Sequence, residues 1–140
     1  MSARRELAAG LAAVPLFSAC SKLDLQIVAR HTELLDVPAG LELVKEGAKG
    51  DAFFFIVLGD AVVSRRGRTV AKLGPGQHFG ELALLDPGPR DATVVAASPM
   101  TVGVLGARVF RAIVRDVPSM SEKLLRGMAQ RLREADLRDA

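Results

Sequence analysis

The chain has 140 residues, of which 49% are hydrophobic and 25% charged, and this composition is typical of one folded domain. Its net charge of +3 is too small to indicate nucleic-acid binding by itself. The single cysteine, Cys20, excludes an internal disulfide framework and favours a reducing compartment. No segment reaches the ~20 apolar residues of a membrane-spanning helix, so we expect a cytoplasmic protein with no membrane partner.

Residues 1–33 are predicted to form N-terminal helices. Residues 2–12 carry an amphipathic helical pattern, which Pro15 interrupts. A second helix is predicted to begin after Ser21, because serine is a good N-cap and Asp24 occupies the capping-box position three residues later. The apolar face expected for this second helix consists of Leu23, Ile27 and Val28.

Residues 34–105 are expected to form an antiparallel, jelly-roll-like β-roll. Single glycines recur between Gly40 and Gly88 and divide this region into short segments rich in Val, Ile, Leu and Phe. Such spacing indicates short antiparallel strands joined by tight turns. Two hairpins are predicted, one turning on Gly59-Asp60 and one with its tip around Gly67.

Residues 107–138 are predicted to form two C-terminal helices, the second beginning at Pro118. The apolar faces expected for them are Val109, Phe110, Ile113 and Val114 in the first, and Leu125, Met128, Leu132 and Ala135 in the second. The heptad-like spacing of the second set allows two interpretations, packing on the same chain or pairing with a second chain. The whole pattern predicts one α+β domain over residues 1–140, with helices before and after the roll.

The segment FGELALLDPGPRDATVV, residues 79–95, contains the groups that best suit ligand binding. Gly80 precedes a predicted one-turn helix whose free N–H groups favour an anion. Arg90 offers a planar fork of donors that matches a phosphate, and Thr93 has a hydroxyl either for the ligand or for the next strand. Glu81 would repel a phosphate, so we expect it to accept hydrogen bonds from a neutral group.

These residues resemble the phosphate-binding cassette of the cyclic nucleotide-binding domain family. The cassette of that family reads F-G-E-L-A-L, then a short loop, then P-R-x-A-T-V, and residues 79–84 and 89–94 match it. The resemblance continues outside the cassette, for example over residues 37–63, and includes the closing helices. We therefore expect residues 1–140 to be a single cyclic nucleotide-binding domain with its cassette at residues 79–94.

The resemblance implies a sensor that binds cAMP by default, with cGMP as the alternative ligand. It implies that Glu81 binds the ribose 2′-hydroxyl and that Arg90 pairs with the cyclic phosphate. It further implies that backbone N–H groups of the cassette complete the phosphate cradle and that the C-terminal helix closes over the base. The ligand-binding residues expected on this basis are Gly80, Glu81, Leu82, Ala83, Arg90, Asp91, Ala92 and Thr93.

Asp91 departs from the family, which commonly has Ala, Ser or Thr at this position. An ionised aspartate cannot donate a hydrogen bond to the ligand, and it is repulsive near a phosphate. Three interpretations follow. Asp91 points to solvent or holds Arg90 in the empty site; it weakens cyclic nucleotide binding; or it accepts from a guanine amino group and favours cGMP.

Other functional classes remain as alternatives. The chain has no Ser/His/Asp set for catalysis, so we expect no enzyme. His78 and Glu81 lack the second histidine of a cupin-like metal site, and His78 is expected at a strand edge. Family members that regulate transcription continue into a helix-turn-helix, so this chain alone is expected to bind no nucleic acid, either as part of a truncated regulator or as a stand-alone domain. The C-terminal helix is the candidate surface for a homodimer or a protein partner.

Overall fold

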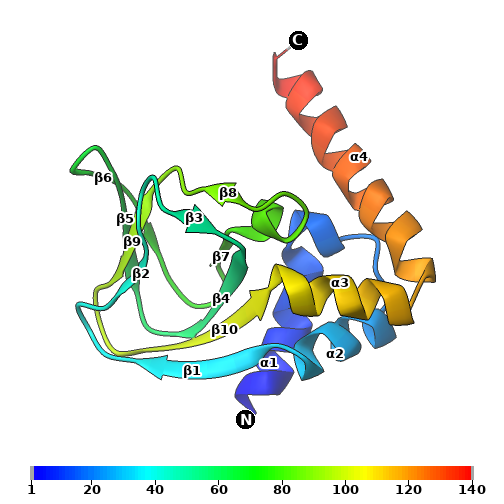
Figure 1. Cartoon of the computed structure of the whole chain (residues 1–140), viewed down its shortest axis with the longest axis horizontal. Coiled ribbons are helices and arrows are strands. Elements are labelled where there is room, and N and C mark those ends of the chain that lie inside the picture. Colours follow the sequence, from blue (N-terminus) through cyan, green and yellow to red (C-terminus); the bar gives the residue numbers. More distant parts are fainter. Residues whose placement is uncertain (1, 140) are drawn as a thin grey trace. The chain divides into compact units, whose positions relative to one another are not determined.

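The computed structural model describes residues 2–139, with side chains up to Asp136 (Figure 1). Residues 1 and 140, the ends of the predicted domain, lie outside the described residues. The chain forms two compact units, which we describe one at a time. The β-roll unit comprises Thr32–Ala107, and the helical unit comprises the residues up to His31 together with those from Arg108 onward.

The elements follow the predicted order of helices, strands and helices, and this confirms the α+β fold class. In chain order they are α1 (Ala3–Gly10), the 3₁₀ turns η1 (Leu11–Ala13) and η2 (Pro15–Phe17), α2 (Lys22–Arg30), β1 (Glu33–Val37), β2 (Glu42–Val44), β3 (Lys49–Gly50), β4 (Ala52–Leu58), β5 (Ala61–Arg65), β6 (Arg68–Leu73), β7 (His78–Phe79), the 3₁₀ turn η3 (Glu81–Leu84), β8 (Gly88–Pro89), β9 (Thr93–Ala96), β10 (Met100–Gly106), α3 (Ala107–Asp116) and α4 (Ser119–Asp139).

The β-roll unit consists of two four-stranded antiparallel sheets and one short two-stranded ribbon. The sheets have the strand orders β1-β10-β4-β7 and β2-β9-β5-β6, and the ribbon pairs β3 with β8. Apolar side chains from both sheets meet in one core, so the sheets pack face to face (Figure 1). The buried members of that core are Val37, Ile56, Ala61, Val94, Ala96, Met100 and Val102.

One of the two predicted hairpins is present and the other is not. The Gly67 hairpin is confirmed, because β5 pairs with β6 and both tip residues, Arg66 and Gly67, have positive φ. The Gly59-Asp60 hairpin is wrong. Strand β4 pairs with β10 and β7, whereas β5 pairs with β6 and β9, so the Gly59 turn carries the chain from one sheet to the other. A glycine in the sequence indicates where a strand ends, but it does not indicate which strand the following segment pairs with.

In the helical unit, the predicted start of α2 is confirmed, and its predicted apolar face is confirmed at Val28 but wrong at Leu23. Ser21 Oγ accepts from the Asp24 N–H at 3.1 Å, and Asp24 Oδ2 accepts from the Ser21 N–H at 2.9 Å, which completes the capping box. Leu23 is 71% exposed, whereas the buried apolar residues of α2 are Leu25, Val28 and Ala29. Two residues of α-helix turn through ~200°, so Leu23 points away from Leu25.

The C-terminal helices also bury faces that differ from the predicted ones. In α3, Phe110 and Ile113 are buried as predicted, but Val109 is exposed. In α4 the apolar face predicted from heptad-like spacing is largely exposed, with Leu125 and Leu132 both in water. The side of α4 that packs contains Met120, Leu124 and Gly127, and this side contacts η2. At Gly127 a Cβ atom would lie 2.8 Å from the Leu16 carbonyl oxygen, so glycine allows the close approach.

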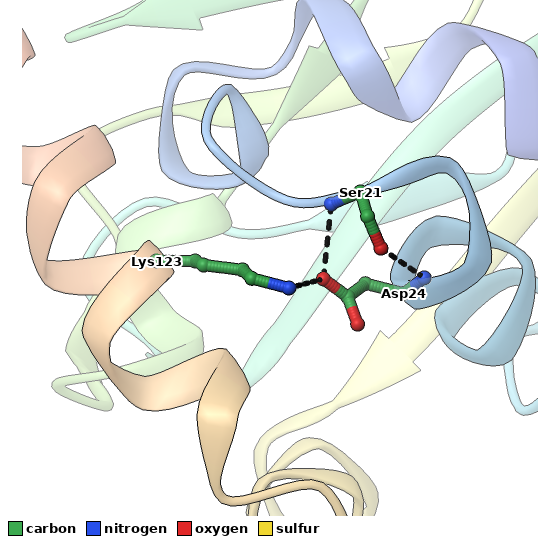
Figure 2. A network of polar contacts seen from close by, with 3 residues as sticks. All are labelled: Ser21, Asp24 and Lys123. Atoms are coloured by element: carbon green, nitrogen blue, oxygen red, sulfur yellow. Dashed lines mark hydrogen bonds and ion pairs between the residues drawn. The ribbon is translucent and has the colours of Figure 1, made fainter.

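A partly buried ion pair joins α4 to α2 within this unit (Figure 2). Lys123 Nζ lies 2.7 Å from Asp24 Oδ2, the same oxygen that accepts from the Ser21 N–H. Burial acts to raise the pKa of the Asp24 carboxyl, but the hydrogen bonds from Lys123 and Ser21 outweigh it and hold the pKa below its ordinary value. The same Asp24 carboxylate also affects the Cys20 thiol. Burial and the negative charge of Asp24 raise the pKa of this thiol to about 11, so the thiol is protonated near neutral pH.

We expect Asp24→Asn to lower the free energy of unfolding by about 2 kcal/mol at pH 7, because it leaves the Lys123 ammonium partly buried without its counter-charge. The lowered pKa of Asp24 means that this contribution is present above about pH 4 and is lost as the pH falls through the folded-state value. Urea unfolding of both proteins at pH 7 and pH 3 measures the difference. Glu122→Gln, which removes an exposed ion pair to Arg126, is the control and should change little. Equal effects of the two substitutions at pH 7 would contradict the expectation.

Candidate functional site

The cassette turns sharply at Gly80, which connects β7 to η3. Gly80 has φ of 82°, a left-handed conformation that favours glycine. A Cβ atom there would lie 2.6 Å from Arg90 Nη1 and 2.8 Å from the Ala52 carbonyl oxygen, so no side chain fits. The predicted one-turn helix is present as a 3₁₀ turn, in which the Ala83 N–H donates to the Gly80 carbonyl at 3.1 Å.

The backbone of Arg90 is held from both sides by the segment that precedes β3. The Arg90 N–H donates to the Ala48 carbonyl, and the Gly47 N–H donates to the Arg90 carbonyl, both at 2.8 Å. The pairing of β3 with β8 continues this ladder at Gly50 and Gly88. These backbone hydrogen bonds therefore fix the position of the Arg90 Cα atom, from which the side chain extends.

The Arg90 guanidinium lies in a narrow slot between glycines. A Cβ atom on Gly50 would come within 1.9 Å of Nε, so Gly50 leaves the space that this part of the side chain fills. Nη2 donates to the Ala52 carbonyl at 2.7 Å, and the guanidinium carbon lies 6.0 Å from the centre of the Phe54 ring. The Nε atom is buried and has no hydrogen-bond partner within residues 2–139.

Burial lowers the pKa of the Arg90 guanidinium from its ordinary value, and the carboxylates of Asp51 and Asp91 act in the opposite direction. An arginine nevertheless keeps its charge at any ordinary pH. A buried charged donor that lacks an acceptor costs free energy, and an anion would supply the missing acceptor. Arg90 therefore has the environment of an anion-binding residue.

Arg90 opens onto a cavity of about 350 Å³, which lies within the size range of small-ligand pockets. Its lining includes Phe54, two lysines and two acidic residues. The lining residues are Glu42, Leu43, Val44, Lys45, Ala48, Lys49, Gly50, Asp51, Ala52, Phe54 and Arg90. No local motif marks Gly50 or Ala52, because each matters through the Arg90 side chain, which comes from far along the chain.

Glu81 lies beside Gly80 but does not appear among the described residues that line this cavity. Its side chain is buried, and Oε2 lies 3.4 Å from His78 Nδ1 on β7, an edge strand as predicted. Leu82, the next cassette residue, is exposed. The structure thus places Arg90 at the cavity, and Glu81 next to the glycine that the Arg90 guanidinium contacts.

The three residues that follow Arg90 alternate in direction. The Asp91 side chain is 88% exposed and pairs with Arg65 at 3.3 Å, so the nearest cation to its carboxylate is on the β5–β6 hairpin. Ala92 is buried. The Thr93 hydroxyl accepts from the Glu46 N–H at 2.9 Å, in the turn that follows β2.

A comparison with protein families places these residues in context. The cyclic nucleotide-binding domain family matches residues 34–116, which include the cassette and most of the β-roll. The chain belongs to this family. It is 32% identical to the Cyclic AMP receptor protein of Thermus thermophilus over 128 residues, covering 88% of this chain and 59% of that protein.

Solved structures agree with this assignment. The N-terminal domain of a transcriptional regulator from Streptomyces coelicolor A3(2) has a TM-score of 0.84 and 30% identity, covering 90% of this chain and 94% of that one. The regulatory domain of Toxoplasma gondii PKA, solved with cAMP, has a TM-score of 0.71 and 33% identity, covering 84% of this chain and 46% of that one. The chain thus spans 59% of the receptor protein and less than half of the kinase regulatory domain.

Within residues 2–139, none of the helices is both long and apolar enough to cross a membrane. The same residues contain no cluster of three or more His, Cys, Asp or Glu side chains arranged to hold a metal ion.

Proposed function

We propose that this chain is a cyclic nucleotide sensor with cAMP as its ligand and no catalytic activity of its own. Membership of the family supports the ligand class, and relatives of this chain include a protein named for cyclic AMP and a regulatory domain solved with cAMP. The observation that carries the proposal is the state of Arg90. Its guanidinium is held in a slot of glycines at a cavity, with a buried Nε that has no acceptor among the described residues.

In the proposed complex, Arg90 binds the cyclic phosphate and Glu81 accepts from the ribose 2′-hydroxyl. Amide groups of the cassette near Leu82, Ala83 and Ala92 complete the phosphate contacts. The Ala83 N–H already donates within η3, so the 3₁₀ turn rearranges if this amide is used. The phosphate competes with the Ala52 carbonyl for Arg90 Nη2, so binding also changes the contact between the cassette and β4.

The signal then passes through the cassette to the C-terminal helix, which closes over the base. We infer the closure of the C-terminal helix from the resemblance to the family. The ligand shifts a population of states because it binds the closed form better than the open one. The output is carried by a partner protein, a second copy of this chain or a further domain.

A second candidate is the sensor part of a CRP/FNR-type transcription regulator. The close structural match to the N-terminal domain of a transcriptional regulator supports it, as does the partial coverage of the receptor protein. The exposed Leu125 and Leu132 on α4, seven residues apart, supply an apolar stripe for a homodimer. Sedimentation velocity with and without cAMP distinguishes a dimer from a monomer.

Isothermal titration with cAMP, cGMP and 5′-AMP tests the proposed function. We expect one site per chain, with the highest affinity for cAMP and the lowest for 5′-AMP. The phosphate of 5′-AMP is not part of a ring, so it differs in charge and shape from the cyclic phosphate. Preference for cGMP would revise the ligand, and absence of binding to both cyclic nucleotides would overturn the function.

We expect Asp91→Ala to change the affinity for either cyclic nucleotide by less than about threefold, since exposed charges contribute little. The Asp91 carboxylate is exposed and pairs with Arg65, so it neither blocks Arg90 nor faces the cavity. Titration of the variant beside the unmodified protein measures this. A tenfold gain for cAMP would show that Asp91 weakens binding, and a selective loss for cGMP would show that it reads guanine.

A further inference from the structure

His78 makes a contact with Glu81 that the proposed function does not use. The imidazole lies on β7 with its ring against Phe53, at a centroid distance of 5.8 Å, and its Nδ1 atom lies 3.4 Å from Glu81 Oε2. This distance is within the range of an ion pair. The orientation, however, is not that of a hydrogen bond, and Nδ1 is buried with no hydrogen-bond partner within residues 2–139.

The protonation of Nδ1 decides whether this contact is favourable. Without a proton, the Nδ1 lone pair lies close to a carboxylate oxygen, which is repulsive; the neutral Nδ1–H tautomer removes this repulsion but carries no net charge. With a proton on both nitrogens, the imidazolium faces the opposite charge of Glu81. Histidine is the side chain whose charge ordinarily changes between pH 5 and 8.

We propose that His78 is a positioning residue for Glu81 and that its protonation strengthens cyclic nucleotide binding. This inference rests on the proposed function. The protonated imidazole orients the Glu81 carboxylate through Oε2. A carboxylate has about four lone-pair sites, so a contact with Nδ1 is compatible with accepting from a ribose hydroxyl.

Charge determines the sign of the effect. An ionised Glu81 repels an anionic ligand, and the imidazolium offsets this repulsion while adding a positive charge to the site. Protonation of His78 therefore favours the bound state, and ligand binding takes up protons. Affinity rises as the pH falls from 8 to 6.

The other charged groups near this contact keep one charge state over that pH range. Within the β-roll unit, β4, on which the imidazole packs, has no titratable side chain, and η3 supplies only Glu81. Arg90 contacts the adjacent Gly80, and Asp51 acts on Arg90. Arginine stays charged, and an ordinary aspartate is ionised throughout. His31, the second histidine of the chain, belongs to the helical unit.

The experiment is a titration with cAMP at pH 6, 7 and 8, at low salt, using the whole chain. We expect about fivefold tighter binding at pH 6 than at pH 8. At pH 7, titrations in two buffers with different ionisation heats should show net proton uptake on binding. His78→Gln should abolish both the pH dependence and the proton uptake, and His78→Phe, which keeps a ring against Phe53, should do the same. His31→Gln is the matched control and should retain both.

The results separate this inference from the proposed function. Binding whose affinity is the same at pH 6 and pH 8, without proton uptake, overturns the role of His78 and leaves the cyclic nucleotide sensor intact. Persistence of the pH dependence in both His78 variants also overturns it. Absence of binding at every pH overturns the function and the inference together. The comparison of affinities at pH 6 and pH 8 uses the unmodified protein, so this part of the test does not depend on the folding of a variant.

Discussion

Arg90→Ala is expected to weaken cAMP binding by about 100-fold or more, because charge-assisted hydrogen bonds to the phosphate are lost together with its counter-charge. The backbone at residue 90 keeps its hydrogen bonds to Ala48 and Gly47, so the cassette loop should remain folded. Isothermal titration measures the affinity, and circular dichroism checks the fold.

Arg68→Ala is the matched control for this substitution, since Arg68 is an exposed arginine on β6 and lines no part of the cavity. It should bind cAMP as the unmodified protein does. If Arg90→Ala bound cAMP within threefold of the unmodified protein, the phosphate would have to bind elsewhere.

Gly50→Ala is expected to weaken cAMP binding by at least about tenfold, through displacement of the Arg90 side chain rather than loss of its charge. The new Cβ would lie 1.9 Å from Nε, far inside van der Waals contact, so the guanidinium must leave its slot. It then loses its hydrogen bond to the Ala52 carbonyl. The Arg90 side chain would no longer be held in the conformation that binds the ligand, and ordering this side chain on binding would cost free energy.

The control for this prediction is Gly88→Ala, at the residue paired with Gly50 in the β3–β8 ribbon. A Cβ on Gly88 meets no atom within 4 Å, and the substitution gives the ribbon the same change in backbone freedom. Titration of the two variants compares them directly. Equal affinities for cAMP would show that the Gly50 slot has no part in binding.

The sequence predicted the fold where local signals and the family resemblance agreed. The Ser21 capping box, the Gly67 hairpin, the turn after Gly80 and the α+β order of elements were predicted correctly. The failures concern non-local partners. The Gly59 signal could not show that β4 and β5 belong to different sheets, and helical periodicity could not show which side of α4 packs on η2.

The site shows the same distinction. Arg90 was found from its cassette motif, because a short window contains most of the pattern. Gly50 and Ala52 were not found, since each acts through an Arg90 atom that comes from about 40 residues further along the chain. The Asp24–Lys123 pair, 99 residues apart, gave no sequence signal. Asp91 left three interpretations open, and the structure favours an exposed side chain paired with Arg65.

The claim that Arg90 binds the phosphate of a cyclic nucleotide is tested most directly by the Arg90 Nε–H resonance in ¹H–¹⁵N spectra. This N–H group is buried and has no acceptor in the described part of the chain, and Arg90→Lys assigns its signal by removing it. We expect saturating cAMP to move the signal downfield and to slow its exchange with water, because the guanidinium gains a charged acceptor. Saturation of the protein with cAMP while this signal stays unchanged would contradict the account.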